Sequence, residues 1–304
     1  MNQMLRWKSD LILLLVAAVW GSGFVAQRLA AASLSTFYFN GGRFLLAAAL
    51  LLPLAHFQRA GQPGVERKQI PWMMLAGALL FAASGLQQAG LATTSIGNAS
   101  FITGLYVVIV PIILFFALRQ RVSALSWFAV FLAAAGVALL SLQGEFSIAP
   151  GDVLELLGAV MWALHIILLG RIAGQGANVL WFSVIQFATC GALNLVLALV
   201  LDPQGINTLA PAWGTIAYSA VFPIGVGFTL QIAGQKHAPP LDAAIILSME
   251  AVFGTLFGYL FLQEVLSSRQ LIGCALLLVA MILAQIRVGP SLPDLSVNSP
   301  SPKA

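Results

Sequence analysis

Residues 178–201 read NVLWFSVIQFATCGALNLVLALVL, a stretch with no charged side chain. An α-helix needs about 20 predominantly apolar residues to cross the hydrocarbon core of a bilayer. Runs of similar length and composition follow one another along most of the chain. The pattern therefore predicts a protein that crosses a membrane many times.

The composition of the whole chain supports a lipid environment. Of its 304 residues, 60% are hydrophobic and only 8% are charged, whereas soluble domains carry about 25% charged residues. The net charge is +4, but the basic residues lie in short segments between apolar runs. That placement is typical of cytoplasmic loops of membrane proteins. We therefore expect a lipid bilayer as a partner and no nucleic acid.

The apolar runs and their polar breaks predict an all-α integral membrane protein with ten transmembrane helices. The expected organisation is a cytoplasmic N-terminus at 1–9, a first five-helix unit at 10–142, a second at 152–287, and a disordered cytoplasmic tail at 288–304. The individual spans are expected at 10–31, 36–57, 70–92, 96–118, 123–142, 152–171, 178–201, 212–234, 241–263 and 268–287. With both termini in the cytoplasm, most of the 14 lysines and arginines fall on that side, as the positive-inside rule requires.

The two halves of the sequence resemble each other. A shift of 144 residues places Gln87 on Gln231, Asn98 on Asp242 and Tyr106 on Glu250, and a shift of 142 places Trp20 on Trp162. Each half holds five expected spans, so the second half enters the membrane from the opposite face. We therefore predict two inverted repeats, an architecture that opens to alternate sides of a central site.

Several local motifs resemble those of a known family. They are Leu247-Ser248-Met249-Glu250-Ala251-Val252-Phe253, Gly258-Tyr259-Leu260-Phe261-Leu262-Gln263-Glu264, Trp20-Gly21-Ser22-Gly23-Phe24-Val25 and Gly41-Gly42-Arg43-Phe44. Over residues 10–287 the chain is similar to the EamA-type branch of the drug/metabolite transporter superfamily. The resemblance implies two inverted five-helix repeats around a central cavity and a place in the bacterial inner membrane. The chain departs from the family pattern at Arg119-Gln120, where a Gly-Glu pair is common.

Three ionisable side chains lie inside expected spans, namely Arg43, His165 and Glu250. A charge in the bilayer costs about 2.5–3.5 kcal/mol on insertion scales, so each requires a partner or a water-filled cavity. Glu250 and His165 are expected at similar depths and can take up and release protons, as proton coupling requires. The alternatives are an acid at Glu250 that serves only to pair with Arg43, and a hydrogen-bonded core histidine at His165.

Large aromatic and neutral polar side chains inside the spans are candidates for the wall of a cavity. Trp20 and Trp162 are expected near the midplane, where they would stack on a solute or simply pack against neighbours. The full candidate set is Trp20, Ser22, Phe24, Gln87, Gln88, Tyr106, Trp162, His165, Gln231 and Ser248. The alternative role for the neutral polar members is hydrogen bonding between helices.

Prolines and small residues suggest where helices bend or approach each other. Pro111 and Pro223 lie inside expected spans and remove a backbone donor, so each predicts a hinge or a static kink. Gly254 and Gly258 form a small-residue face, suited to close helix packing or to a homodimer.

Motifs for catalysis and cofactor binding are missing from the sequence. It contains no HExxH, Walker A or GxSxG element, and the GxGxxA match at 21–26 lies inside an expected span rather than after a strand. The histidines and the two cysteines, Cys190 and Cys274, are scattered, so we expect no metal and no cofactor.

The function expected from these features is secondary active transport rather than catalysis. The first hypothesis is export of a small amino-acid-like metabolite by proton antiport or exchange. The alternatives are uptake of a vitamin or nucleoside-like solute, and a membrane-embedded enzyme or lipid-handling protein.

Overall fold

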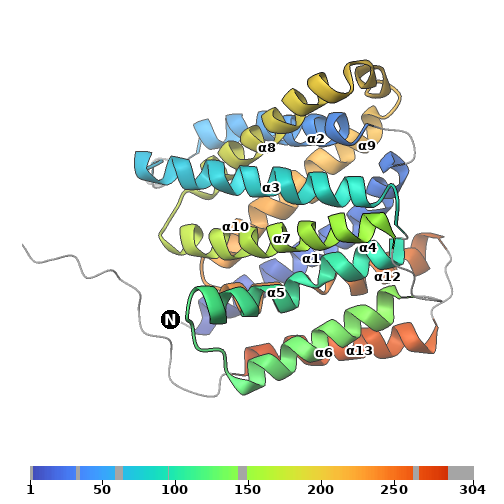
Figure 1. The fold of residues 1–304 in the computed structure, drawn as a ribbon. Coiled ribbons are helices and arrows are strands. Elements are labelled where there is room, and N and C mark those ends of the chain that lie inside the picture. Colours follow the sequence, from blue (N-terminus) through green and yellow to red (C-terminus); the bar gives the residue numbers. More distant parts are fainter. Residues whose placement is uncertain are drawn as a thin grey trace, which may run out of the picture.

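The computed structural model describes residues 3–31, 35–58, 64–94, 96–142, 149–262 and 267–286. Within these ranges the regular elements are all helices, and they lie roughly parallel in one bundle (Figure 1). The expected tail at 288–304 and the side chain of Phe24 lie outside what the structure describes. Helix α1 starts at Gln3, seven residues before the first expected span at 10–31.

Within the described ranges, the first half of the chain forms six α-helices and two short helical segments. They are α1 (Gln3–Ala31), α2 (Thr36–His56), η1 (Arg67–Gln69), α3 (Ile70–Gly90), α4 (Ile96–Gly104), α5 (Tyr106–Ile112), the π-helical η2 (Ile113–Ala117) and α6 (Ala124–Ser141). Side-chain caps fix some of the helix starts. The Ser123 side chain, for example, accepts a hydrogen bond from Ser126 N and satisfies a free donor in the first turn of α6.

The described part of the second half contributes seven α-helices and two other helical segments. They are α7 (Pro150–Gly174), α8 (Val179–Leu201), η3 (Pro203–Thr208), α9 (Trp213–Ser219), the π-helical η4 (Ala220–Phe228), α10 (Thr229–Gln235), α11 (Pro240–Leu247), α12 (Glu250–Leu262) and α13 (Ser268–Gln285). Asn178 and Ser267 cap α8 and α13 through their side chains. These caps mark the start of two of the expected spans.

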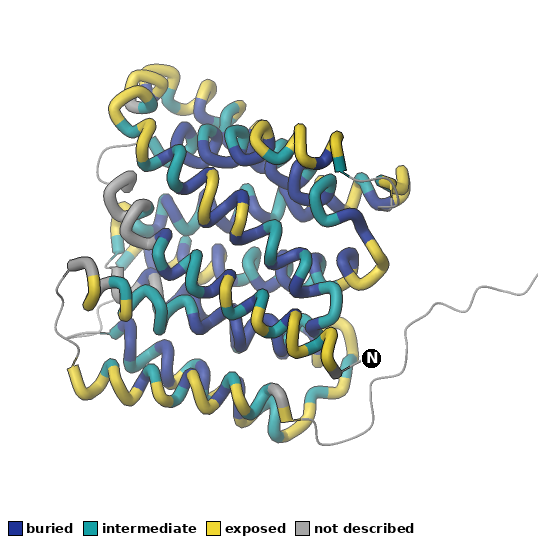
Figure 2. Tube along the Cα trace, turned by 180° about the vertical axis from the view of Figure 1, so that it is seen from behind, coloured by how far each residue is buried: buried dark blue, intermediate teal, exposed yellow. Residues whose placement is uncertain are grey.

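The outer surface of the bundle is apolar. In the described part of the chain, seven helices are long and apolar enough to cross a membrane, judged by length and composition. Figure 2 shows exposed residues along the outward faces of the helices and buried residues inside. The exposed positions include Phe128, Phe131, Leu199 and Val200. Because such a surface is unfavourable in water, the chain is an integral, multi-pass membrane protein.

Three of the expected spans are not continuous α-helices. The stretch 96–118 divides into α4, α5 and η2, and 212–234 divides into α9, η4 and α10. Pro111 precedes η2 and Pro223 lies within η4, where the missing proline N–H removes an α-helical hydrogen bond. The third span, 241–263, breaks at Ser248 and Met249 between α11 and α12.

Close helix packing organises the bundle. Helix α2 packs against α8, α6 against α13, and α3 against α7 and α8 (Figure 1). Helix α1 packs against α12 where Gly21 meets Gly254; a Cβ atom on Gly21 would lie 2.7 Å from Gly254 N and from Phe253 Cβ. The small residue at Gly254 therefore serves packing within the chain. A homodimer remains a prediction.

An ion-pair cluster joins the first and last helices at one end of the bundle. Arg6 Nη2 donates to Asp242 Oδ2 at 2.8 Å and to the Ala284 carbonyl at 3.3 Å, and Arg6 Nε lies 4.0 Å from Asp10 Oδ2. The cluster connects α1, α11 and α13. The start of α1 and the end of α13 therefore lie at the same end of the bundle.

Candidate functional site

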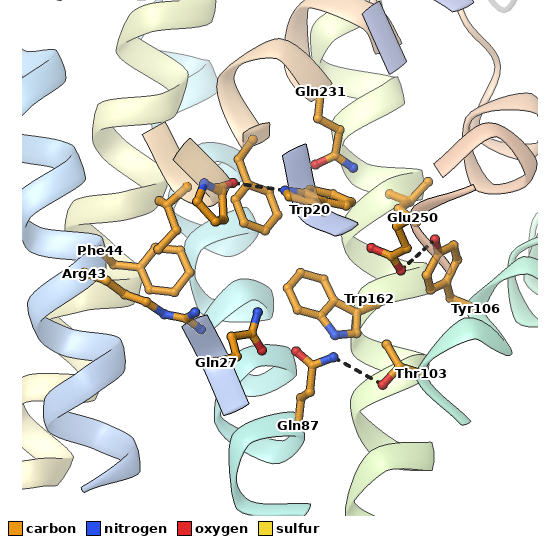
Figure 3. A pocket seen from close by; sticks show the side chains of 14 residues that line it. Trp20, Gln27, Arg43, Phe44, Gln87, Thr103, Tyr106, Trp162, Gln231 and Glu250 are labelled. Carbon is orange, nitrogen blue, oxygen red and sulfur yellow. Dashed lines mark hydrogen bonds between the residues drawn. The ribbon is translucent and has the colours of Figure 1, made fainter. Parts of the chain in front are cut away.

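A cavity of about 70 Å³, counted as the space open to the centre of a water-sized sphere, lies in the middle of the bundle. Its wall combines aromatic rings, amides and two oppositely charged side chains (Figure 3). The residues that line it are Trp20, Gln27, Arg43, Phe44, Gln87, Thr103, Tyr106, Trp162, Ile166, Pro223, Ile224, Phe228, Gln231 and Glu250. They come from both halves of the sequence.

The cavity brings together many of the residues singled out from the sequence. Those that line it are Trp20, Arg43, Gln87, Tyr106, Trp162, Pro223, Gln231 and Glu250. Both members of three repeat-related pairs are among them: the two tryptophans, the two glutamines, and Tyr106 with Glu250. The shift between the halves therefore matches residues that share one site.

Other candidates lie away from the lining. Ser22 Oγ forms hydrogen bonds with the Val19 carbonyl and with the Tyr218 hydroxyl, and Ser248 Oγ donates to the Ile245 carbonyl. The two serines thus form hydrogen bonds between or within helices, which is the alternative role given above for the neutral polar candidates. Gln88 and Pro111 are buried but do not line the cavity.

His165 also lies behind the cavity wall. It is fully buried, and its Nε2 lies 3.2 Å from Gln186 Oε1. Its ring is 5.9 Å from the Phe228 ring, edge to face. His165 thus has the geometry of a hydrogen-bonded core histidine that supports an aromatic residue of the wall.

Aromatic rings form one side of the cavity, with Phe228 at their centre. The Trp20 ring lies 4.8 Å from Phe228, and the Trp162 ring stacks on Phe228 at 5.9 Å with an interplanar angle of 10°. Trp20 is held further by its Nε1, which donates to the Pro223 carbonyl at 3.0 Å in η4. The wall is therefore a rigid apolar surface suited to a flat or aliphatic group.

Arg43 supplies the positive charge of the cavity. Its guanidinium lies 4.6 Å from the Phe39 ring centre and 5.4 Å from that of Phe44, and the residue is only 4% exposed. Nε has no hydrogen-bond partner, and within the described ranges no carboxylate lies at ion-pair distance. The expected alternative, an Arg43–Glu250 ion pair, is therefore not formed in this structure.

Glu250 supplies the negative charge and is paired with a tyrosine. Tyr106 Oη donates to Glu250 Oε1 at 3.3 Å. Tyr106 is the first residue of α5 and Glu250 the first residue of α12, so each stands directly after a break in an expected span. Non-helical breaks at such depth are typical of binding sites in membrane proteins.

Amide groups with free hydrogen-bonding capacity complete the lining. Gln231 is fully buried, and both its Oε1 and Nε2 are without a partner among the described residues. Trp162 Nε1 and Gln27 Oε1 are also buried without a hydrogen-bond partner among the described residues. Because buried polar atoms are normally satisfied, these groups mark positions where a bound solute or water would form hydrogen bonds.

Sequence reasoning missed several residues of the site. Gln27 lies seven residues after Trp20, on the same helix face, so helical periodicity could have found it. Phe228 has no comparable signal in a chain with 19 phenylalanines. Thr103 lines the cavity and hydrogen-bonds to a buried acid, Glu155, which stands in an otherwise apolar run. Among the described residues, no group of His, Cys, Asp and Glu is arranged to hold a metal.

Known proteins that resemble this chain do so over most of its length. The EamA-like transporter family matches residues 7–142 and 149–285. An uncharacterized transporter of Archaeoglobus fulgidus is 32% identical over 286 residues, which cover 93% of this chain and 87% of that protein. An uncharacterized transporter of Synechocystis is 25% identical, over 92% of this chain and 90% of that protein.

A solved crystal structure shares the fold. It aligns with a TM-score of 0.76 over 91% of this chain and 96% of the other, at 17% sequence identity. The two family matches together span nearly all of the helical bundle described above. The chain belongs to the EamA-like transporter family of the drug/metabolite transporter superfamily.

Proposed function

We propose that the protein is a secondary active transporter that exports a small amino-acid-like metabolite across the bacterial inner membrane, by proton antiport or exchange. The observation that carries this proposal is the presence of Arg43 and Glu250 in one cavity without an ion pair between them. In Figure 3 the two groups lie on either side of Trp162. A solute with both an anionic and a cationic group would satisfy both.

Each part of an amino acid has a matching partner in this site. A guanidinium binds a carboxylate through two parallel hydrogen bonds, and the unpaired Nε of Arg43 is one available donor. The Glu250 carboxylate pairs with an ammonium group. The rings of Trp20, Trp162 and Phe228 pack against an apolar side chain or attract the cationic group through their faces.

The architecture proposed for transport is ten membrane helices in two inverted five-helix halves, 10–142 and 152–287, with both termini cytoplasmic. Support comes from Tyr106 and Glu250, which are 144 residues apart, are matched by the repeat, and each begin a helix after a break. Interrupted helices at the interface of two repeats allow one part to move against the other around a central site.

Glu250 is the group proposed to couple solute movement to protons. Tyr106 is the titratable side chain in contact with it. Of the helices packed against α12, α6 carries no titratable residue, and α1 carries Arg6, Lys8, Asp10 and Arg28. The two nearest to the contact at Gly21 are Arg28, seven residues after it, and Asp10, 11 residues before it, which correspond to about 10 Å and 16 Å along the helix. A proton and a solute ammonium therefore compete for the same carboxylate.

The experiment uses the purified protein reconstituted in lipid vesicles. A thermal-shift screen against a metabolite library first identifies a solute, and its radiolabelled form is then followed in two assays. Exchange of internal for external solute tests transport itself, and flux driven by a pH gradient tests coupling. We expect Glu250→Gln to bind the solute more weakly, to retain exchange at saturating solute, and to lose the response to the pH gradient, because the amide neither takes up nor releases a proton.

The matched control is Glu66→Gln, since Glu66 is an exposed acid that pairs with Lys68 at 2.8 Å on the surface. This variant should respond to the gradient as the wild type does. A Glu250→Gln protein with an unchanged response would refute the coupling role. Solute movement in the same direction as the protons would assign uptake in place of export.

A further inference from the structure

A second acidic side chain, Glu155 in α7, lies just behind the cavity wall. The residue is 0% exposed. Thr103 Oγ1 donates to Glu155 Oε2 at 2.8 Å, and Gln87 Nε2 donates to Thr103 Oγ1 at 3.2 Å. Gln87 and Thr103 line the cavity (Figure 3), whereas Glu155 does not. A continuous hydrogen-bonded chain therefore leads from the cavity to a buried carboxyl group.

No described cation lies close enough to neutralise this carboxyl group. The helices packed most closely on α7 are α3, α4, α5, α10 and α11, and the titratable residues they contribute are Tyr106 and Asp242. Asp242 is paired with Arg6. Within α7 itself, Asp152 lies one turn away, while His165 and Arg171 lie about 15 Å and 24 Å along the helix.

The remaining oxygen of Glu155 is also without a partner. Its Oε1 is buried and makes no hydrogen bond among the described residues. An ionised carboxylate with one unsatisfied oxygen and no nearby cation is strongly unfavourable in a low-dielectric interior. In this conformation Glu155 is therefore a neutral carboxylic acid that holds a proton.

The neighbouring glycine makes room for this group. A Cβ atom on Gly90 would lie 2.8 Å from Glu155 Oε1 and 3.0 Å from its carboxyl carbon. Any side chain at position 90 would thus displace the carboxyl group from its place against α3. The acid occupies a site formed for it by two helices and a hydroxyl donor.

We propose that Glu155 is a second proton-binding site of the transporter, which exchanges its proton with the cavity through Thr103 and Gln87. On uptake, a hydronium ion in the cavity gives a proton to Thr103 Oγ1 while the Thr103 hydroxyl passes its own hydrogen to Glu155 Oε2, which leaves neutral water and a neutral acid; release is the reverse. Gln87 donates to Thr103 Oγ1 and so orients the hydroxyl towards the acid. The role in transport rests on the proposed function, but proton binding at Glu155 is measurable without any solute.

Infrared spectroscopy of the full-length protein in lipid vesicles tests the proposal. A protonated carboxyl group has a C=O stretching band that shifts when the vesicles are transferred to D₂O. We expect Glu155→Gln to lose one such band, which Glu250→Gln retains. Thr103→Val should keep the band but slow its deuterium exchange about tenfold, the effect expected from losing one hydrogen bond of the path.

The test includes a control for the threonine substitution and a second variant that perturbs Glu155 without replacing it. Thr255→Val serves as the matched control and should leave the exchange rate unchanged, because the Thr255 hydroxyl, as far as the described residues go, bonds to the Ala251 carbonyl within its own helix α12. Gly90→Ala keeps the acid and moves its carboxyl group, so it should shift the band even where Glu155→Gln folds poorly. An unchanged band in Glu155→Gln, or wild-type exchange in Thr103→Val, would overturn the proposal. A failure of solute exchange would instead count against the transport function alone.

Discussion

Replacement of Arg43 by methionine should separate stability from solute binding. Methionine is similar in length to the buried part of arginine but carries no charge. In the structure the guanidinium stacks on Phe39 and Phe44 and forms no ion pair within the described ranges. Its removal therefore takes away the partner of a solute carboxylate without leaving a carboxylate of the protein unpaired.

The expected change in stability follows from two opposing contributions. Loss of the contacts with the two aromatic rings costs about 0.5–2 kcal/mol. Loss of a charge from the membrane interior recovers about 2.5–3.5 kcal/mol on insertion scales. Arg43 lines the cavity, so water entering the cavity would solvate the guanidinium and reduce this recovery. We therefore expect Arg43→Met to unfold at the same or a higher temperature than the wild type.

The expected change in binding has the opposite sign. A hydrogen bond to a charged group contributes about 1.5–3 kcal/mol, so Arg43→Met should weaken the binding of a carboxylate solute about 10- to 150-fold. The assay compares an amino acid with its amide, which differ only in the carboxylate, by thermal shift over a range of concentrations.

The wild type should prefer the acid over the amide, and Arg43→Met should bind both equally weakly. The same preference for the acid in both proteins would refute the role assigned to Arg43. A large loss of stability in Arg43→Met would refute the energetic argument, because it would mean that the guanidinium is satisfied by contacts other than those described.

Two further predictions concern the helix contacts that hold the bundle together. Gly21→Leu should lower the free energy of unfolding by about 1–3 kcal/mol or more, because a Cβ atom at this position already lies 2.7 Å from the backbone of α12. The control is Gly214→Ala on α9, where no atom lies within 4 Å of the added Cβ. It should be neutral or stabilising in the same thermal-unfolding assay. Arg6→Ala should lower the free energy of unfolding by about 1.5–3 kcal/mol, because it breaks the charged hydrogen bond between α1 and α11. Its control, Lys8→Ala, removes an exposed charge from α1 and should change the free energy of unfolding little. Equal midpoints for the two members of either pair would contradict the corresponding prediction.

The membrane fold could be predicted because its determinants are local. An uncharged run such as 178–201 has to be helical inside a membrane, since backbone polar groups in lipid must be satisfied within the segment. The irregular helices near Pro111 and Pro223 could be predicted for the same reason, because each proline removes a hydrogen-bond donor from its own helix. The break at Ser248 and Met249 has no such local cause, so the sequence predicted a continuous helix there.

The site was only partly predictable because its geometry depends on which helix faces meet. Trp20, Arg43 and Glu250 stand out in apolar runs by their size or charge, and the structure places all three on the cavity wall. His165 stands out equally, yet its helix face turns it towards Gln186. Phe228 occupies the centre of the aromatic wall but looks like any other phenylalanine in an apolar sequence. Glu155 could have been recognised as an intramembrane acid one turn inside the start of its span.

The unsatisfied groups around the cavity are the strongest physical argument for transport. Arg43 Nε, both amide atoms of Gln231 and Trp162 Nε1 are buried without partners among the described residues, and each such group destabilises the empty protein. A solute that pairs with them recovers this free energy on binding. Because the contacts are spread over helices from both halves of the chain, a movement of one half against the other would remove several at once. The same arrangement that binds the solute in one conformation would therefore release it in the other, as alternating access requires.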